Sequence, residues 1–356
     1  MPRRRALVYA LVVSTSVAAV LGYAGYVVWR MNAEVAAAQP IAGVPLPALP
    51  TPAMAPAKAS AAAALSRPYM LFRTTALGDH FGRVSLAYLD ALGEPRSVSP
   101  LSCDRVHFAA GMGICLEAVR KNITSYRAHI FDRQFNLRHT VPLHGPPSRA
   151  RVSPDGRLAA FTVFVSGHSY DSPGFTTRSS IIDTASGRLL LEDLETVPVL
   201  KDGAPFKSVD FNFWGVTFAR DGRRFYATLG TGGKAYLVEG NLDTRQMKVL
   251  HDDVECPSLS PDNTRIAFKR RQAMDSAGRR IWRLLVVDLG TGKEVLLDKE
   301  MRNVDDQVEW LNDQEILYAM PKSDAQAGSD VWSLRTDAGS PPRLLLQSAF
   351  SPAATR

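Results

Sequence analysis

The sequence predicts an all-β protein of six radially repeated four-stranded sheets, preceded by one transmembrane helix and an Ala/Pro-rich linker. Two kinds of turn alternate along the 356-residue chain. One contains Asp and often Gly, as in Asp-Thr-Ala-Ser-Gly at 183–187; the other is Ser-Pro-Asp-Gly at 153–156 or Ser-Pro-Asp-Asn at 260–263. Short apolar runs separate these turns. Alternation of two turn types at a regular period is typical of a β-propeller.

The charge of the chain argues against a nucleic-acid partner. The formal net charge is +7, and part of the excess lies near the N-terminus, in Arg3, Arg4, Arg5 and Arg30. The remainder is therefore only weakly basic. It shows no dense basic surface studded with aromatic residues, which nucleic-acid-binding proteins usually present.

Residues 6–29 form an uncharged, mainly apolar run that predicts a signal anchor. As a helix this run spans the ~30 Å hydrocarbon core of a bilayer. The apolar stretch of a cleavable signal peptide is shorter, at about 7–15 residues, although the alanines at 36–38 leave cleavage as an alternative. The arginines at 3–5 place residues 1–5 in the cytoplasm. We therefore expect a single-pass protein of the inner membrane with its C-terminal domain on the extracytoplasmic, periplasmic side.

Residues 30–66 are rich in Ala and Pro and predict a linker rather than a folded unit. Such a composition cannot bury a core, and its prolines favour an extended, semi-rigid spacer. The segment should hold the domain at 67–356 away from the membrane.

The turns divide the chain after residue 100 into five complete blades, each with strands a to d from the channel outward. Pro presets φ in the Ser-Pro-Asp-Gly turn, which joins a to b, and the Asp-containing turn joins c to d. Blade five is the clearest, with strands at 257–260, 265–269, 282–288 and 294–297. Two long loops, 166–178 and 197–208, lengthen the interval between blades three and four.

Blade one has only three strands before residue 100, at 69–74, 83–90 and 96–99. Its innermost strand is missing. Phe-Ser-Pro at 350–352 is similar to Val-Ser-Pro at 152–154, where strand a of blade three ends. We therefore expect the C-terminal tail to supply strand a of blade one and so to remove two open sheet edges.

The repeat resembles that of TolB-type propellers, whose consensus is a Ser-Pro-Asp-Gly turn followed by an Ile-Ala-Phe-like strand. The segments at 153–161 (SPDGRLAAF) and 260–268 (SPDNTRIAF) carry the resemblance, which extends over roughly 69–350. It implies a six-bladed TolB-like β-propeller. In that family the propeller is a protein-binding module of the cell envelope, in some cases as a translocation component.

The sequence shows no catalytic constellation and no expected cofactor. Gly-Thr-Gly-Gly-Lys at 230–234 lacks the spacing of a phosphate-binding loop and joins two strands. No Gly-x-Ser-x-Gly elbow occurs. The seven histidines are scattered, without the spacing of a metal site. We therefore predict a binding protein rather than an enzyme.

Candidate binding residues gather where the innermost strands begin. Aligning the a–b turns places several polar residues at one end of the channel: Arg149, Asp210, Asn212, Glu255, Asp305 and Asp306. Converging carboxylates could hold a cation such as Ca²⁺ or a basic peptide; alternatively, they are ordinary polar residues of a wet channel. Two further candidates for ligand contact, His168 and Tyr170, lie in the long loop of blade three.

Three functions remain open. The first is a tethered module that binds an envelope protein or peptide. The alternative is a metal-assisted hydrolase, lactonase or lyase in the channel, with Glu255, Asp306 and Asp210 as ligands. The third is a structural scaffold without a channel ligand. Metal analysis of the purified domain separates the enzyme from the others.

The predicted location places the three cysteines in an oxidising compartment, where disulfides form. With the hairpin turn of blade two at 111–113, Cys115 lies opposite residue 109, about 20 Å along the strand from Cys103. That separation exceeds disulfide reach. We therefore expect no Cys103–Cys115 bond, and the state of Cys256 stays open.

Overall fold

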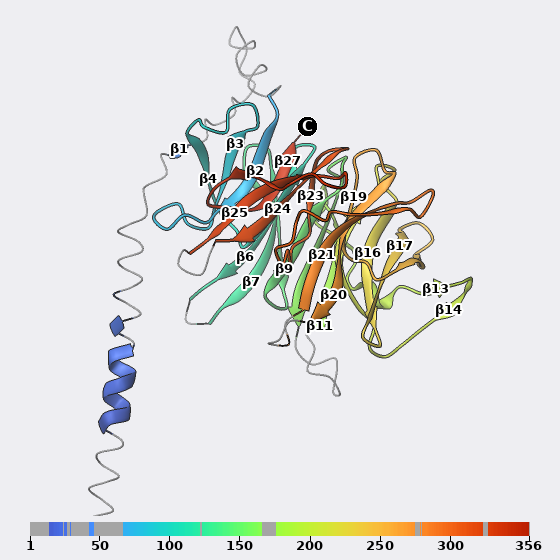
Figure 1. Ribbon diagram of the computed structural model, residues 1–356, viewed down its shortest axis with the longest axis horizontal. Helices are drawn as coiled ribbons and strands as arrows, with labels where there is room; N and C mark the ends of the chain where they lie inside the picture. The colour runs from blue at the N-terminus through green and yellow to red at the C-terminus, as the bar shows by residue number, and fades with distance from the viewer. Residues whose placement is uncertain are drawn as a thin grey trace, which may run out of the picture.

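The computed structural model describes residues 14–23, 25, 26, 29, 43–45, 67–121, 123–165, 176–274, 278, 280–322 and 327–355. Within these residues the strands form six sheets arranged as the blades of a propeller (Figure 1). Each blade contains four antiparallel strands, and two blades carry additional strands. The predicted all-β six-bladed fold is confirmed.

The first three blades occupy the N-terminal half of the propeller. Blade one contains β27 (Ala349–Thr355), β2 (Tyr69–Thr74), β3 (Arg83–Tyr88) and β4 (Arg96–Ser102), from the channel outward. Blade two contains β5 (Arg105–Ala109), β6 (Met112–Val119), β7 (Ser125–Asp132) and β8 (Leu137–Leu143). Blade three contains β9 (Pro147–Val152), β10 (Leu158–Val165), β11 (Thr176–Asp183) and β12 (Leu189–Leu191).

The other three blades complete the ring. Blade four contains β15 (Asn212–Phe218), β16 (Arg224–Thr231), β17 (Lys234–Asn241) and β18 (Gln246–Asp252). Blade five contains β19 (Glu255–Leu259), β20 (Arg265–Met274), β21 (Arg280–Asp288) and β22 (Glu294–Leu296). Blade six contains β23 (Glu309–Asn312), β24 (Glu315–Pro321), β25 (Ser329–Arg335) and β26 (Arg343–Leu346).

The C-terminal strand closes the ring as predicted. β27 pairs antiparallel with β2, with Tyr69 opposite Thr355 and Thr74 opposite Ala349. Ser351 also joins blade one to blade two, because its Oγ donates to the Val106 carbonyl at 2.8 Å and accepts from the Val106 amide at 3.1 Å. The chain therefore begins and ends its propeller in one blade.

Apolar side chains fill the space between neighbouring blades. Because side chains alternate across a strand, each central strand contributes to the clusters on both sides of its sheet. One such cluster joins blades two and three through Ile114, Ile130, Phe161 and Ile182. The core is therefore a ring of inter-blade layers rather than one central mass.

The predicted register of blade two is wrong. Cys103 and Cys115 form a disulfide, with Cα atoms 5.4 Å apart. The hairpin turns at Ala110 and Gly111, which both have positive φ, and Cys115 consequently lies opposite Val106. Since β5 begins only two residues after Cys103, both cysteines lie at the same end of the hairpin. Cys256 is a free, buried cysteine.

Two segments extend the blades beyond four strands. Part of the long loop at 197–208 forms β13 (Val199–Lys201) and β14 (Ala204–Phe206), which lie at the outer side of blade four (Figure 1). In the predicted linker, β1 (Gly43–Pro45) pairs in parallel with β4. Residues 166–175, the part of the predicted long loop of blade three that contains His168 and Tyr170, lie outside the described residues.

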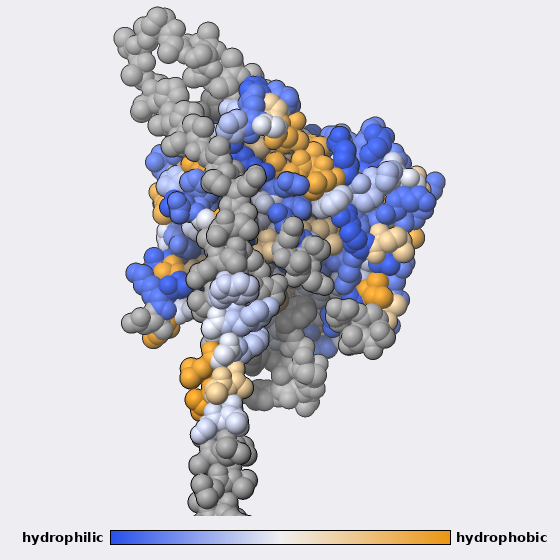
Figure 2. Space-filling model, turned by 60° about the vertical axis from the view of Figure 1, so that its left-hand side comes forward, coloured by the Kyte–Doolittle hydropathy of each residue, from blue (hydrophilic) through white to orange (hydrophobic). Residues whose placement is uncertain are grey.

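The described N-terminal helix covers residues 14–23. No helix among the described residues is long and apolar enough to cross a membrane. The span predicted over residues 6–29 includes residues outside the described set and stays a prediction. The visible face of the propeller is largely hydrophilic, with smaller hydrophobic patches (Figure 2).

Candidate functional site

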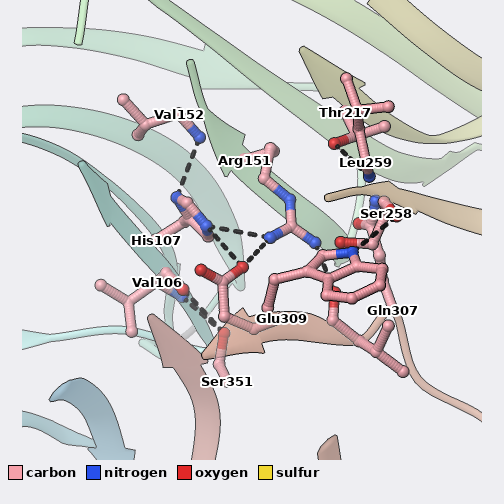
Figure 3. A network of polar contacts seen from close by, with 12 residues as sticks. Val106, His107, Arg151, Val152, Thr217, Ser258, Leu259, Gln307, Glu309 and Ser351 are labelled. Carbon is pink, nitrogen blue, oxygen red and sulfur yellow. Dashed lines mark hydrogen bonds and ion pairs between the residues drawn. The ribbon is translucent and has the colours of Figure 1, made fainter. Parts of the chain in front are cut away.

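The middle of the channel is closed by a buried polar network rather than left open. His107 from β5, Arg151 from β9 and Glu309 from β23 point toward one another (Figure 3). Glu309 Oε2 accepts from Arg151 and lies 3.2 Å from His107 Nε2. The side chains of the three residues are at most 10% exposed. The network joins three blades through side chains alone.

Hydrogen bonding indicates the tautomer of His107. The Val152 amide donates to Nδ1 at 3.0 Å, so Nδ1 carries no proton. A neutral imidazole then carries its proton on Nε2, which lies 3.2 Å from Glu309 Oε2 and 3.0 Å from Arg151 Nη1. Arg151 also donates to the Val308 carbonyl at 2.9 Å. The buried Arg–Glu pair is therefore supported by further hydrogen bonds, as such pairs require.

Two more side chains of blade six close the channel toward blades four and five. The Gln307 amide donates to the carbonyls of Val216 at 3.1 Å and Pro257 at 2.8 Å. The Trp310 indole donates to the Ser258 carbonyl at 2.8 Å. These bonds satisfy backbone groups on the channel-facing edges of inner strands, and they separate the channel into two mouths.

We call the side on which the innermost strands begin the strand-start face, and the side of the a–b turns the turn face. At the strand-start face, Asp305 and Asp306 precede β23. Asp306 is buried and forms an ion pair of 2.9 Å with Arg105. Asp305 pairs with Lys269 and lies 3.8 Å from Arg149. These five residues form what we call the ion belt.

The ion belt changes the interpretation of the predicted carboxylates. The surrounding protein partly desolvates Asp305, although its side chain is exposed, and this works against ionisation; Lys269 and Arg149 nevertheless hold its pKa below the ordinary value. Each aspartate is therefore paired with a basic side chain of another blade. Sequence reasoning missed Arg105 and Lys269; Arg105 begins an innermost strand, so the alignment of the turns could have identified it.

The other predicted residues, Asp210, Asn212 and Glu255, line a separate pocket of about 330 Å³ on the same face. Asp210 accepts from the Gly232 amide at 2.7 Å, from Ser208 and from Thr231. These bonds lower the pKa of Asp210 to about 2. The carboxylate therefore holds the β16–β17 turn in place.

Asn212 and Glu255 differ in their surroundings. Asn212 Oδ1 accepts from the backbone and hydroxyl of Thr177, at 2.9 and 2.6 Å, and so ties blade four to blade three. Burial raises the pKa of Glu255 although Lys269 and Arg280 oppose the shift. The structure thus divides the six predicted residues between the ion belt and the pocket.

Across the described parts of the chain, no group of three or more His, Cys, Asp or Glu residues could hold a metal ion. On the turn face a second pocket of about 540 Å³ is lined by residues of the closed network and by apolar residues such as Phe108 and Phe218.

Comparisons with known proteins support the fold. No protein-family model and no curated protein sequence matches the chain. The structure of TolB from Acinetobacter baumannii is similar with a TM-score of 0.54 and 17% identity, over 82% of this chain and 67% of that chain. A putative TolB from Agrobacterium tumefaciens matches with a TM-score of 0.47 and 10% identity, over 79% of this chain and 88% of that chain.

A putative 6-phosphogluconolactonase from Bacteroides uniformis matches with a TM-score of 0.44 and 12% identity, over 78% of this chain and 81% of that chain. Because TM-scores below 0.5 do not establish a shared topology, the assignment depends on the Acinetobacter structure. At that level of identity the likeness concerns the fold alone. The chain is a six-bladed β-propeller similar in fold to TolB.

Proposed function

We propose that this protein is a membrane-tethered, extracytoplasmic propeller that binds a protein or peptide segment of the cell envelope through its strand-start face. The observation that carries the proposal is the position of Asp305. Its side chain is 62% exposed, whereas its partners Lys269 and Arg149 are only 5% and 13% exposed. An exposed carboxylate held by two largely buried basic side chains offers a partner a charge that is already oriented.

The charges of the ion belt favour selective recognition of a partner over strong electrostatic attraction to it. Its three basic and two acidic side chains nearly balance, so the face offers a pattern of charge rather than a strong net field. Complementary charge patterns mainly determine partner choice and association rate. A preorganised surface also reduces the ordering cost of binding. The partner we propose is a segment that places a basic group beside Asp305.

The tether is the second part of the proposal and comes from the sequence. The apolar run at 6–29 and the arginines at 3–5 support an inner-membrane anchor with the propeller outside the cytoplasm. Alkaline phosphatase fused after Arg67 should be active, and a reporter that works only in the cytoplasm should be silent there. The reverse pattern would contradict the proposed location.

Charge reversal at one exposed position tests the binding face. Asp305→Lys should lower recovery of crosslinked partner from intact cells at least about tenfold, since like charges across an interface cost several kcal/mol. Asp243→Lys is the control for charge reversal alone, because Asp243 has the same 62% exposed side chain but an exposed arginine partner, in a c–d turn. Asp305→Lys also removes the partner of Lys269, which is 5% exposed, so thermal unfolding of both purified variants checks that the fold is kept. Equal recovery with the two variants would exclude the strand-start face as the binding surface.

Asp306 is unsuitable for this test. Its side chain is 6% exposed and is paired with Arg105. Removal of its charge leaves a buried guanidinium without its partner, a change that typically costs about 3–5 kcal/mol. Loss of binding in Asp306→Asn would therefore report on folding.

A further inference from the structure

The pocket beside the ion belt has the size of a small-molecule site. Its volume of about 330 Å³ lies at the lower end of the ~300–1,000 Å³ typical of such sites. The walls come from the connection between blades three and four, which includes the 3₁₀ helix η1 (Leu194–Thr196), from the first residues of β15, and from the β16–β17 and β20–β21 hairpins. Three blades therefore hold it in shape.

One wall of the pocket consists of an aromatic ring and the backbone of glycine residues. A Cβ atom added at Gly230 would lie 2.7 Å from ring atoms of Trp214, so the indole packs directly over this glycine. Gly232 and Gly233 continue the turn with φ of +56° and +73°. The Asp210 carboxylate holds the turn through the Gly232 amide. The wall is thus rigid before any ligand arrives.

Charges of both signs line the pocket from different elements. Glu195 comes from η1, on the side of blade three. Arg271 and Arg280 come from the β20–β21 hairpin of blade five, and Lys234 from β17. Arg271 also donates to the Gly233 carbonyl at 3.1 Å. Glu195 thus lines the pocket from the side of blade three, and the basic groups line it from blades four and five, where Asp253 and Glu255 also contribute.

Glu195 is in an environment that favours a cationic ligand. Burial and the neighbouring Asp193 raise the pKa of Glu195 to about 7, while Arg178 of β11 opposes the shift. The other element packed against η1 is β15, which contributes no charged side chain. An ammonium group placed beside Glu195 would counter the repulsion from Asp193 and favour the ionised carboxylate.

We infer that this pocket binds a small zwitterion, a free amino acid or dipeptide, with its ammonium against Glu195 and its carboxylate against Arg280 and Arg271. A ligand with a single charge would leave either Glu195 or the pair Arg280 and Arg271 without an opposite charge from the ligand, which is unfavourable for partly desolvated groups. The volume accommodates a ligand with two such ends and a small side chain. Trp214 provides an apolar surface for that side chain.

The experiment uses calorimetric titration of the full-length chain in detergent with alanyl-alanine, its N-acetyl derivative and its C-terminal amide. The dipeptide should bind, and each derivative should bind at least about tenfold more weakly, because each lacks one charge-assisted contact. Absence of dipeptide binding would overturn the inference, as would equal affinity for all three compounds.

Two substitutions test which side chain contacts each end of the ligand. Glu195→Gln should remove the discrimination against the acetylated dipeptide, and Arg280→Gln the discrimination against the amide. In the wild type the affinity for the dipeptide should rise severalfold between pH 5.5 and 7.0 as Glu195 ionises, and Glu195→Gln should abolish that rise. Arg223→Gln, at a side chain 68% exposed on the turn face, is the control. Wild-type selectivity in both pocket variants would refute the assignment.

Discussion

Truncation after Gln347 should unfold the propeller, although it removes only the last residues of the chain. The deleted strand β27 is the innermost strand of blade one. Three of its alanines, Ala349, Ala353 and Ala354, are 0%, 0% and 8% exposed. At about 0.8 kcal/mol for each buried methyl group, these side chains contribute about 2 kcal/mol.

The larger loss lies on β2, which would become an open edge. Met70, Leu71 and Phe72 are at most 1% exposed and belong to the clusters that contain the three alanines. Full burial of such side chains is worth about 1.5–3 kcal/mol each, so exposing half of each costs about 2–4 kcal/mol. The combined cost of about 5 kcal/mol equals the whole stability of many domains.

The measurement is thermal unfolding of the chain that ends at Gln347, with the chain that ends at Thr355 as control. We expect insoluble protein or a midpoint lowered by at least about 10 °C, because a kcal/mol shifts the midpoint of a large domain by about 2–4 °C. A synthetic peptide covering 348–356 should restore part of the loss. An unchanged melting temperature in the shorter chain would refute ring closure by β27.

Three other changes test separate parts of the fold. Cys103→Ser should lower the free energy of unfolding by about 3 kcal/mol, measured in urea without reductant, because the disulfide closes a loop of separation 12; dithiothreitol should reproduce the effect in the wild type. Gly113→Ala should cost about 1–3 kcal/mol, since its Cβ would lie 2.1 Å from the ring of Phe131, whereas Gly93→Ala, with open space around it, should change little. Glu309→Gln should cost about 3 kcal/mol or more because it leaves Arg151 buried without its ion-pair partner; a loss below about 1 kcal/mol would show that the network contributes little.

Turn chemistry made the blade count and the closing strand predictable. Pro and Gly occupy particular positions in the a–b and c–d turns, so the phase of the repeat can be read directly. The register of blade two could not be read in this way. Its two-residue turn places Ala110 at φ +47°, a conformation that alanine rarely adopts and that no turn motif indicates. The two glycines at 111 and 113 suggested a different centre.

The location of the site could be predicted from the sequence, but the ion-pair partners of its aspartates could not. Aligned turns place Asp305 and Asp306 at the start of an innermost strand, as the structure has them. Their partners come from other blades, since Arg105 lies 201 residues from Asp306. Such pairs depend on how the ring closes, and no local pattern records that geometry. The pocket depends likewise on the segment between blades three and four, where the repeat is interrupted.

Position-specific photocrosslinking in intact cells tests the proposed binding face most directly. A photoreactive amino acid at position 305 lies on the strand-start face, at an exposed position. One at Arg157, whose side chain is 82% exposed beside an a–b turn, lies on the turn face. We predict a discrete protein adduct from position 305 and none from position 157. An adduct from position 157 alone, or none from either position, would contradict recognition through the strand-start face.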